Sequence, residues 1–291
     1  MKKIKRYIYI IFRPIFEFFE TNQRFRQMRF ELSSADKILL ANTDNGMFLV
    51  NSKDRVIGLN SYAKRQSWDF RKFEIVNKLL PRHNQKVLVD VGANIGSISI
   101  SALINNYFTS AIAVEPEPNN FQLLKANRIL NKLENKLKLH NFALGSVGKQ
   151  SAYLSLNNIN HGDHRLIIDK PHSGANIQVD VLTLDSILPN FEQNDSLIWI
   201  DVQGYEGFVL QGGEKAIKNL IPIVLEFSPD IPGGEENCAV IIDILNNSKY
   251  DTIVDLKTPN KILSLDKNTL DQLFRNLCHK NSFTDLFIFK K

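Results

Sequence analysis

One segment constrains the fold of this chain more than any other part. Residues 87–91 read VLVDV and residues 92–96 read GANIG, directly before Ser97. A continuous apolar run such as VLVDV is typical of a strand buried on both faces of a parallel sheet. Glycines at the following corner let a ligand approach the backbone, and the start of the next helix offers unpaired N–H groups. The segment therefore predicts an α/β fold with a ligand site where this strand ends.

From Lys86 to the end of the chain, strand-like runs alternate with helical patterns, which indicates parallel strands joined by crossover helices. Main strands are expected at Val87–Val91, Ala111–Glu115, Leu137–Ala143, Leu197–Asp201, Ile223–Phe227, Thr252–Leu256 and Leu286–Phe289, with helices near 96–106, 117–130, 205–218, 238–247 and 267–276. Two further extended stretches, Ser151–Leu156 and Ile177–Leu182, interrupt this alternation. They enclose a polar loop at 161–175, which is too long for a plain connection and points to a function.

The part of the chain before this pattern divides into two regions. Residues 1–35 form a basic, amphipathic N-terminal arm, and residues 36–84 form a small α+β cap that precedes the main domain at 85–291. The elements expected in the cap are strands at Lys37–Ala41, Gly46–Asn51 and Arg55–Leu59, separated by turn residues, and a helix at about Asp69–Leu80.

The spacing around the glycine turn narrows the class of ligand. The turn lacks the G-x-G-x-x-G pattern of a dinucleotide fingerprint, and Asp90 precedes it on the strand. The next strand ends at Glu115-Pro116, about 20 residues beyond the turn, where a carboxylate can accept both hydroxyls of a ribose. An exposed charge at a strand end is the alternative for Glu115. The order of strand, turn and carboxylate favours a nucleoside ligand, and the spacing disfavours an NAD-dependent oxidoreductase.

Several blocks of sequence occur in a specific order. They read DVGANIGSIS from Asp90, VEPEPNNFQLLKANRILN from Val114, NFALGS from Asn141, TLDSIL from Thr183, IWIDVQGYEGFVLQGGEKAI from Ile198 and IVLEF from Ile223. Together they resemble the FkbM family of S-adenosylmethionine-dependent methyltransferases, over about Lys86 to Phe227. The resemblance implies a class I methyltransferase fold, with a Rossmann-like, mostly parallel sheet and an antiparallel last strand. It also implies S-adenosyl-L-methionine as cofactor and methyl transfer, commonly to a hydroxyl oxygen of a sugar, a lipid-linked glycan or a secondary metabolite.

The same resemblance implies a set of cofactor-binding residues. In chain order, from the methionine part of the cofactor through the ribose to the adenine, they are Asp90, Gly92, Asn94, Gly96, Glu115, Pro116, Phe142 and Ala143. Glu115 corresponds to the ribose carboxylate. Asp201, which ends the fourth main strand, is expected close to both the methyl donor and the acceptor, so it belongs to the cofactor set and to the catalytic set.

One position departs from the family pattern. The family usually shows Asp-Val-Glu-Gly where this chain has Asp201-Val202-Gln203-Gly204. If that glutamate were a required base or metal ligand, the chain would be inactive or would use a different mechanism. A catalytically degenerate cofactor-binding protein is therefore an alternative to the enzyme. Glu206, in the same turn, does match the family and is a further catalytic candidate.

Methyl transfer to a hydroxyl oxygen needs an aligned acceptor and a group that removes its proton. Such a group should lie near the carboxyl ends of the parallel strands, where ligands bind in open α/β sheets. Asp201, Glu206 and Glu226 are expected there.

The segment HGDHR at 161–165 is the densest group of reactive side chains outside the glycine turn. Its histidines titrate near neutrality and could act as bases oriented by Asp163. The segment could also bind a metal, hold an acidic acceptor through Arg165, or be a solvated polar loop. The spacing of recognised zinc sites is absent, and no metal is expected. The catalytic candidates are Asp201, Glu206, His161 and His164.

The composition bounds the partners and the compartment. With 36 lysines and arginines against 31 acidic residues, the net charge is +5, which is too low for a dedicated nucleic-acid binder. It fits attraction to an acidic glycan, a lipid head group or the carboxylate of a ligand. The two cysteines, Cys238 and Cys278, form no disulfide framework and indicate a reducing compartment, so a cytoplasmic location is expected. The acceptor and the oligomeric state, a homo-oligomer included, stay open.

The N-terminal arm has features of a membrane-surface segment. Residues 1–6 are basic, and the apolar run at 7–12 stops at Arg13-Pro14. That run is too short for a transmembrane span and has no signal-peptide cleavage site behind it. Further apolar and aromatic residues continue to Phe19, with three arginines beyond them. A basic amphipathic helix of this type lies on membrane surfaces, and residues 1–30 are expected to make such a contact. A docking helix or a dimer contact is the alternative.

Overall fold

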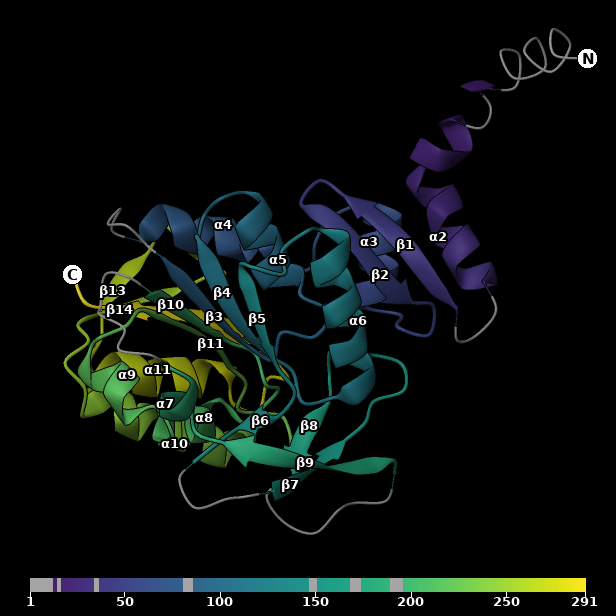
Figure 1. Cartoon of the computed structure of the whole chain (residues 1–291). Helices are drawn as coiled ribbons and strands as arrows, with labels where there is room; N and C mark the ends of the chain where they lie inside the picture. Colours follow the sequence, from purple (N-terminus) through teal and green to yellow (C-terminus); the bar gives the residue numbers. More distant parts are fainter. Residues whose placement is uncertain are drawn as a thin grey trace, which may run out of the picture.

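The computed structural model describes residues 13–14, 17–33, 37–80, 86–146, 151–167, 174–188 and 196–291. The main domain is built on an eight-stranded sheet with the order β13-β12-β14-β11-β10-β3-β4-β5 (Figure 1). Its strands are β3 (Val87–Val91), β4 (Ser110–Val114), β5 (Leu137–His140), β10 (Ser196–Ile200), β11 (Ile223–Phe227), β12 (Thr252–Asp255), β13 (Ile262–Ser264) and β14 (Thr284–Phe289). The five strands β5, β4, β3, β10 and β11 are parallel, and β14 lies antiparallel between β11 and β12. This arrangement confirms the predicted α/β fold with an antiparallel last strand.

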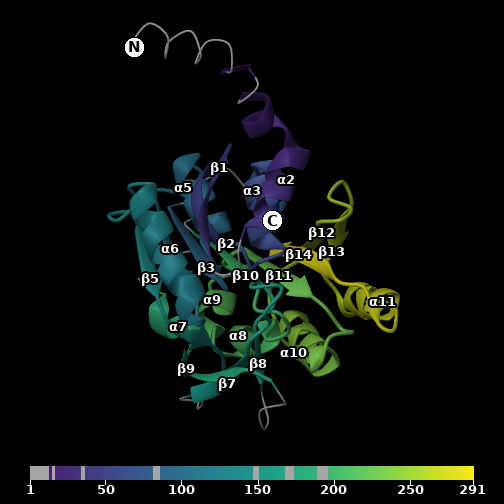
Figure 2. The same cartoon turned by 90° about the vertical axis from the view of Figure 1, so that its right-hand side faces the viewer.

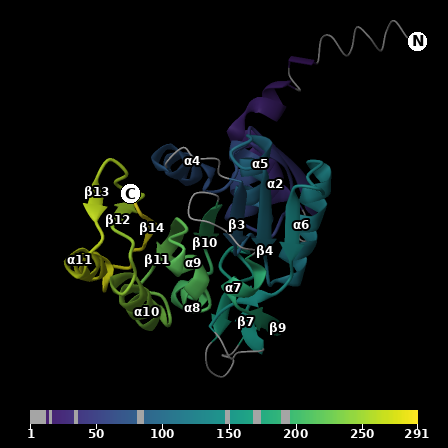
Figure 3. The same cartoon turned by 60° about the vertical axis from the view of Figure 1, so that its left-hand side comes forward.

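Helices cover both faces of this sheet (Figures 1 and 3). One face carries α4 (Phe70–Leu79), α5 (Ser97–Ile104) and α6 (Pro118–Leu130), and the other carries α7 (Leu184–Ile187), α8 (Glu206–Gln211), α9 (Glu214–Lys218), α10 (Gly234–Asn246) and α11 (Lys267–Leu277). Neighbouring residues of one strand enter opposite cores: Leu88 belongs to the first apolar cluster and Val89 to the second. Burial on both faces explains why the strands are continuous apolar runs.

The helix predicted at 205–218 is interrupted at Gly212-Gly213, which gives α8 and α9. A Cβ on Gly212 would lie 2.1 Å from the carbonyl oxygen of Gly145. The two backbones can therefore approach only because residue 212 has no side chain, and this approach separates the two short helices.

The cap contains a hairpin and helices instead of three strands. Together with the arm, its elements are α2 (Gln23–Leu32), β1 (Ile38–Thr43), β2 (Gly46–Asn51) and α3 (Ile57–Lys64). The helix predicted at about Asp69–Leu80 is confirmed as α4, which packs on the main sheet. The antiparallel pair β1–β2 confirms the first two predicted strands. The third, Arg55–Leu59, is wrong because α3 begins there. The Asp54 carboxylate accepts the N–H groups of residues 56, 57 and 58 at 3.0, 3.1 and 2.9 Å, and acceptors placed before a first turn in this way stabilise a helix start.

The cap packs against the main domain. Phe30 of α2 is fully buried, and the buried cap residues share one apolar cluster with β3, α4 and α5. Figure 2 shows α2 beside α3 at the edge of the molecule. The buried Asn127 of α6 accepts the N–H of Leu49 at 2.6 Å and donates to the carbonyl of Ile95, in the glycine turn, at 2.9 Å. One side chain thus links the cap strand to the turn, while the boundaries at residues 35 and 84 stay a prediction.

A second, four-stranded sheet lies at the carboxyl ends of the main strands (Figure 1). Its order is β6-β9-β7-β8, with β6 (Ala143–Leu144), β7 (Ser151–Ser155), β8 (Arg165–Ile167) and β9 (Asn176–Leu182). The strand predicted at Leu137–Ala143 is therefore divided between the two sheets. The loop predicted at 161–175 contains β8, and its residues 168–173 lie outside the described residues.

Within the described residues, no helix is both long and apolar enough to cross a membrane. The predicted membrane-surface segment, residues 1–30, includes residues 1–12 and 15–16, which lie outside the described residues. In its described part, Phe18 and Phe19 are 53% and 46% exposed. Their rings make edge contacts with each other and with Phe25.

The Asn127 link gives a test of how the cap is attached. We expect Asn127→Ala to lower the free energy of unfolding by about 3 kcal/mol, because buried backbone groups of β2 and of the turn lose their partner. Urea unfolding followed by circular dichroism measures the change. Gln272→Ala, on the exposed side of α11, is the control and should stay within about 0.5 kcal/mol of the unchanged chain. A loss for Asn127→Ala as small as the control's would contradict the link.

Candidate active site at the glycine turn

The turn after β3 needs its glycines for two different reasons. Gly92 and Gly96 have φ angles of 82° and 93°, and Asn94 between them has a φ of 52°. This left-handed region favours glycine and is tolerated by asparagine. A Cβ on Gly92 would lie 1.9 Å from the carbonyl oxygen of Asp201. A Cβ on Gly96 would lie 2.7 and 2.8 Å from side chains of α5 and α6. Gly92 therefore lets β3 meet the end of β10, and Gly96 lets two helices pack.

Asp90 supports the turn from inside the sheet. Its buried carboxylate accepts the N–H of Ser99, in the first turn of α5, at 3.1 Å. Burial raises the pKa of Asp90 to about 6. The side chain does not line the cavity beside the turn. Its contacts fix where α5 begins relative to β3, so its effect on a ligand would be indirect.

Glu115 follows β4 and faces the turn. It is buried, with one carboxylate oxygen accepting the N–H of Asn94 at 2.8 Å and the other accepting the N–H of Glu117 at 2.9 Å. Burial raises the pKa of Glu115 to about 8, although both backbone N–H groups oppose this shift. Each oxygen keeps a second lone pair, so the carboxylate can also accept two hydroxyl donors from a ligand.

A cavity that is partly open to solvent lies at the carboxyl ends of β3, β4 and β10. The predicted residues that line it are Gly92, Asn94, Glu115, Pro116, Phe142, Ala143, His161, His164 and Asp201. Three other predicted residues, Asp90, Gly96 and Glu206, do not line it. The lining residues that the sequence reasoning missed include Asn120, Leu154 and Leu166, and Gln203, the departure from the family pattern, also lines the cavity.

A polar loop closes over this cavity. The side-chain amides of Asn94 and Asn120 donate to the carbonyl oxygen of His161 at 2.7 and 2.8 Å. The loop is therefore fastened to the glycine turn and to the start of α6 at once. Asn120 is separated from His161 by 41 residues, and no local pattern signals the contact.

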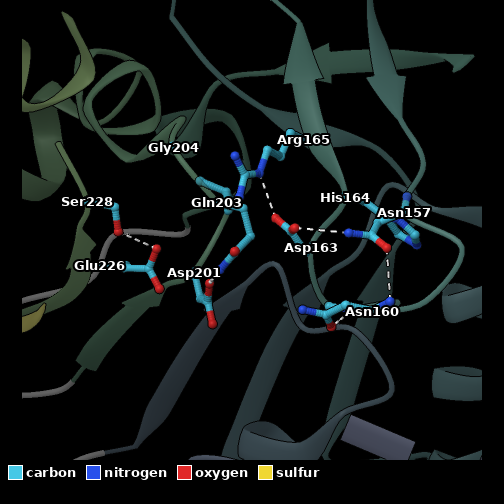
Figure 4. A network of polar contacts seen from close by, with 12 residues as sticks. Asn157, Asn160, Asp163, His164, Arg165, Asp201, Gln203, Gly204, Glu226 and Ser228 are labelled. Carbon is cyan, nitrogen blue, oxygen red and sulfur yellow. Dashed lines mark hydrogen bonds and ion pairs between the residues drawn. The ribbon is translucent and has the colours of Figure 1, made fainter. Parts of the chain in front are cut away.

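The imidazole of His164 is held in one protonation form. Its Nδ1 accepts the N–H of Asn157 at 3.0 Å, so a neutral ring carries its proton on Nε2. Burial lowers the pKa of His164 and favours this neutral form. In this form the ring is a hydrogen-bond donor without a free lone pair. Asp163 does not orient either histidine as expected: it accepts from Arg165 at 2.6 Å and from Asn157 at 3.0 Å (Figure 4).

Asp201 lies directly after β10 and lines the cavity. Its Oδ1 accepts a hydrogen bond from the amide Nε2 of Gln203 at 2.6 Å (Figure 4). Gln203 has a φ of 55°, and this turn brings its side chain back to the carboxylate. Burial, followed by the neighbouring carboxylate of Glu226, raises the pKa of Asp201 well above its ordinary value.

Glu206 is fully buried and shapes the turn that follows Asp201. Its carboxylate accepts the N–H groups of Val202 and Gly204 at 3.1–3.2 Å and the side-chain amide of Asn237 at 2.9 Å. Burial raises the pKa of Glu206 to about 7. These contacts use the carboxylate within the protein, so the geometry indicates a positioning role for this catalytic candidate.

The histidine segment does not assemble a metal-ligand set. In the described part of the chain, the one group of three ligand types lying together is Asp230, Cys278 and His279, at the C-terminal end of α11. The Asp230 oxygens there accept the backbone N–H groups of residues 279–281. A structural role in this turn accounts for Asp230.

The sheet order, the antiparallel β14 and the carboxylate after β4 define the class of this protein: a class I methyltransferase fold with a nucleoside-type cofactor cavity. Residues 90–252, more than half of the chain, match the methyltransferase FkbM domain. The chain belongs to the FkbM family of methyltransferases, which use S-adenosylmethionine. The family, fold class and cofactor expected from the sequence are confirmed.

Two solved structures illustrate the likeness in fold. Methyltransferase FkbM from Methylobacillus flagellatus KT has 18% identity and a TM-score of 0.46, and the match covers 73% of this chain and 45% of that one. TYW2 from M. jannaschii, in complex with AdoMet, has 12% identity and a TM-score of 0.46, with 89% and 90% covered. No curated protein sequence matches the chain.

The cavity suits S-adenosylmethionine in its donors, acceptors and charge. Glu115 offers carboxylate oxygens for ribose hydroxyls, and Phe142 with neighbouring leucines offers apolar surface for a flat base. The carboxylate of Asp201 complements a cationic sulfonium. No lysine or arginine is found among the described lining residues, which is unfavourable for the pyrophosphate of a dinucleotide.

An experiment can separate the steric collision expected at Gly92 from the backbone strain of a positive φ angle. Gly92→Ala is expected to abolish measurable binding of S-adenosylhomocysteine and to lower the melting temperature strongly, because the new Cβ collides with the Asp201 carbonyl. Gly233→Ala is the matched control: φ is 75° there, and a Cβ would meet nothing within 4 Å. Its cost is the backbone strain alone, about 1–2 kcal/mol. Calorimetric titration and thermal melts measure both. Equal effects of the two substitutions would contradict the proposed contact.

Proposed function

We propose that this protein is an S-adenosylmethionine-dependent O-methyltransferase that acts on a hydroxyl group of a sugar, a glycan or another polar metabolite. The observation that supports this most is the shared cavity: the ribose-type carboxylate of Glu115 and the carboxylate of Asp201 line the same space from neighbouring parts of the sheet edge.

On this proposal the lining residues hold the cofactor in order. Glu115 accepts the ribose hydroxyls, the Phe142 ring contacts the adenine, and the backbone at Gly92 and Asn94 surrounds the methionine part. When bound, S-adenosylmethionine supplies an electrophilic methyl group on its sulfonium. The loop at residues 157–164 limits the entry of water, and exclusion of water favours reaction with the aligned acceptor.

Asp201 is the residue that we propose as proton acceptor. A hydroxyl oxygen becomes a good nucleophile only as a base removes its proton. Asp201 lies on the edge of the cavity where such a base is needed. His164 would instead donate a hydrogen bond from Nε2, and His161 stays a candidate for contact with the acceptor. Glu206 would act through the turn that it holds behind Asp201.

A groove beside the cavity supports a hydroxylated acceptor. It encloses about 1370 Å³ of space open to solvent and shares Leu166 and Gln203 with the cofactor cavity. Its polar walls include Asn158, Arg165 and Glu236. Among the described residues, Arg165 donates to Asp163 through Nε, and its other N–H groups can donate to acceptor oxygens. Such side chains suit a ligand with many hydroxyl groups.

A second candidate is a cofactor-binding protein without catalysis, favoured by Gln203 at the position of the family glutamate. Transfer of an isotopically labelled methyl group into glycans or lipids of source-cell extract distinguishes the two. The enzyme should label a specific acceptor, and Asp201→Asn should lower labelling at least a hundredfold. Cofactor binding without labelling of any fraction would favour the degenerate protein.

The cofactor proposal is tested most directly at Glu115. Glu115→Gln and Glu115→Ala should remain folded and bind S-adenosylhomocysteine at least tenfold more weakly, a loss of about 1.4 kcal/mol or more, because the ribose hydroxyls lose their charged acceptor. Calorimetric titration gives the dissociation constants. Glu134→Ala, on an exposed residue between α6 and β5, should bind as the unchanged chain does. Full affinity in both Glu115 variants would show that the ribose lies elsewhere.

We further propose that the protein is located in the cytoplasm and that its arm contacts the anionic surface of a membrane. Residues 1–35 hold eight lysines and arginines and three glutamates, which leaves 28 basic and 28 acidic residues for the rest of the chain. The whole net charge of +5 therefore belongs to the arm. The exposed Phe18 and Phe19 lie on this charged segment, and basic charge combined with exposed aromatics favours the surface of an anionic bilayer.

Vesicle binding tests the arm. The protein should sediment with vesicles that contain phosphatidylglycerol, much less with pure phosphatidylcholine, and less again at high salt. Phe18→Ser with Phe19→Ser should weaken this binding roughly tenfold through lost apolar contact. Ile129→Ser, at a 56% exposed residue of α6, is the control and should have no effect. Light scattering in parallel measures the oligomeric state. If the protein is a dimer and the double substitution dissociates it, the arm serves self-association instead of membrane contact.

A further inference from the structure

Carboxylates form a row across three neighbouring strands at the methyl-transfer edge. The register pairs Ile200 of β10 with Leu225 of β11, so one residue further Asp201 lies beside Glu226 (Figure 4). Glu226 is in turn paired with Asp285 of β14. Paired residues of adjacent strands have their side chains on the same face, about 5 Å apart. Asp201 therefore has the glycine turn on one side and a second carboxylate on the other.

The other charges near this row come from two helices. They are Glu206 of α8, and Asp69 and Lys72 at the start of α4. Lys72 binds Asp285 at 2.8 Å and Asp69 at 3.0 Å. Although burial lowers the pKa of Lys72, these two carboxylates raise it above its ordinary value, so the ammonium stays charged. Lys72 is thus engaged by two carboxylates, neither of which belongs to the adjacent pair.

Asp201 and Glu226 are half-buried and neighbouring, and in the described part of the chain neither forms an ion pair. Two such carboxylates hold one proton between them. Burial first, and then neighbouring carboxylates, raises the pKa of Asp201 well above its ordinary value and that of Glu226 to about 7, although the charge of Lys72 opposes the shift at Glu226. A proton on one member removes the repulsion. The hydrogen-bond partners of the pair decide which member carries it.

Those partners differ in what they can do. Asp201 accepts from the amide nitrogen of Gln203, which only donates and therefore favours an ionised carboxylate. Glu226 lies 2.5 Å from the hydroxyl oxygen of Ser228, which can donate to a carboxylate or accept from a carboxylic acid. The geometry places the charge on Asp201 and the proton on Glu226.

We propose that Gln203 and Glu226 are positioning residues that keep Asp201 ionised beside the cofactor cavity, with Glu226 holding the proton of the pair. This rests on the proposed function. During methyl transfer the acceptor O–H bond breaks and its proton binds to Asp201. The acceptor oxygen bonds to the methyl carbon as the bond from that carbon to the cofactor sulfur breaks, and the electron pair of that bond stays on sulfur. The pair then carries two protons and no charge, as the sulfonium loses its positive charge, so charge balances across the step.

Binding of two ligands reports the charge on Asp201 without any acceptor. S-adenosylmethionine is a sulfonium cation, whereas S-adenosylhomocysteine is neutral at sulfur. As the pH rises and Asp201 ionises, S-adenosylmethionine should bind more tightly relative to S-adenosylhomocysteine, and the ratio of the two dissociation constants measures this change. Calorimetric titrations across pH 5 to 9 give this ratio. In Asp201→Asn, the ratio of the two dissociation constants should no longer depend on pH.

Three variants then test the assignment. Glu226→Gln resembles a protonated Glu226, so the pH profile of the ratio should keep its midpoint. Gln203→Glu adds a third carboxyl group and should raise the midpoint by about one pH unit or more. Gln211→Glu, on the exposed end of α8, is the control and should leave it unchanged. A midpoint lowered by a unit in Glu226→Gln would place the charge on Glu226 and overturn the proposal, as would an unmoved midpoint in Gln203→Glu.

Infrared difference spectra provide a readout that needs no ligand. At neutral pH, Ser228→Ala should shift the protonated-carboxyl band of the pair, because the Ser228 hydroxyl contacts Glu226, and a band that does not move would overturn the proposal. Folded protein that binds neither ligand would refute the proposed function, yet the infrared comparison would still decide where the proton lies.

Discussion

The meeting of β3 and β10 at their carboxyl ends is the contact on which the rest of the site depends. Asp201 donates its backbone N–H to the carbonyl of Val91 at 2.9 Å, and no side chain fits at Gly92 between the two backbones. The chain continues from these neighbouring strands in different directions, and such a point of divergence is where open α/β sheets bind ligands. The contact fixes Asp201 at the centre of that edge and directs the glycine turn toward the cavity, which Glu115 then lines from the other side.

Four carboxylates surround this contact, three of them buried and one, Asp201, half-buried, and their hydrogen bonds separate two kinds of role. Asp90 and Glu206 accept N–H groups of the local backbone and lie outside the cavity, so they stabilise the turns after β3 and β10. Glu115 and Asp201 line the cavity and keep acceptor capacity beyond their internal partners. An unpaired carboxylate away from water lowers the stability of the fold. Carboxylates such as Glu115 and Asp201 are therefore expected where a ligand or a proton completes their interactions.

The sequence allowed prediction where local pattern decides structure. The bounds of β3 and β11 follow from runs that are apolar except for one acidic residue each, and Glu115 follows from its place after the second strand. The α3 helix was missed because its start depends on the Asp54 side chain, and a short apolar run fits helix and strand equally. The protonation form of His164 and the hydrogen bond from Asn120 to the loop were not predicted either. Both depend on contacts between residues that only the folded chain brings together.

Gln203 shows how a departure from a family pattern can be compatible with chemistry. A glutamate at this position would add a carboxyl group next to Asp201, and Lys72 is already bound to Asp69 and Asp285. Such a glutamate would be favoured in its protonated form, in which it donates a hydrogen bond to Asp201. An amide offers an N–H donor at the same place without a proton that can exchange. Glutamine in place of the family glutamate therefore retains the hydrogen bond that orients Asp201. In the proposed reaction it also removes a second carboxyl group that could bind the proton in place of Asp201. Loss of a required base would have the opposite effect on proton transfer.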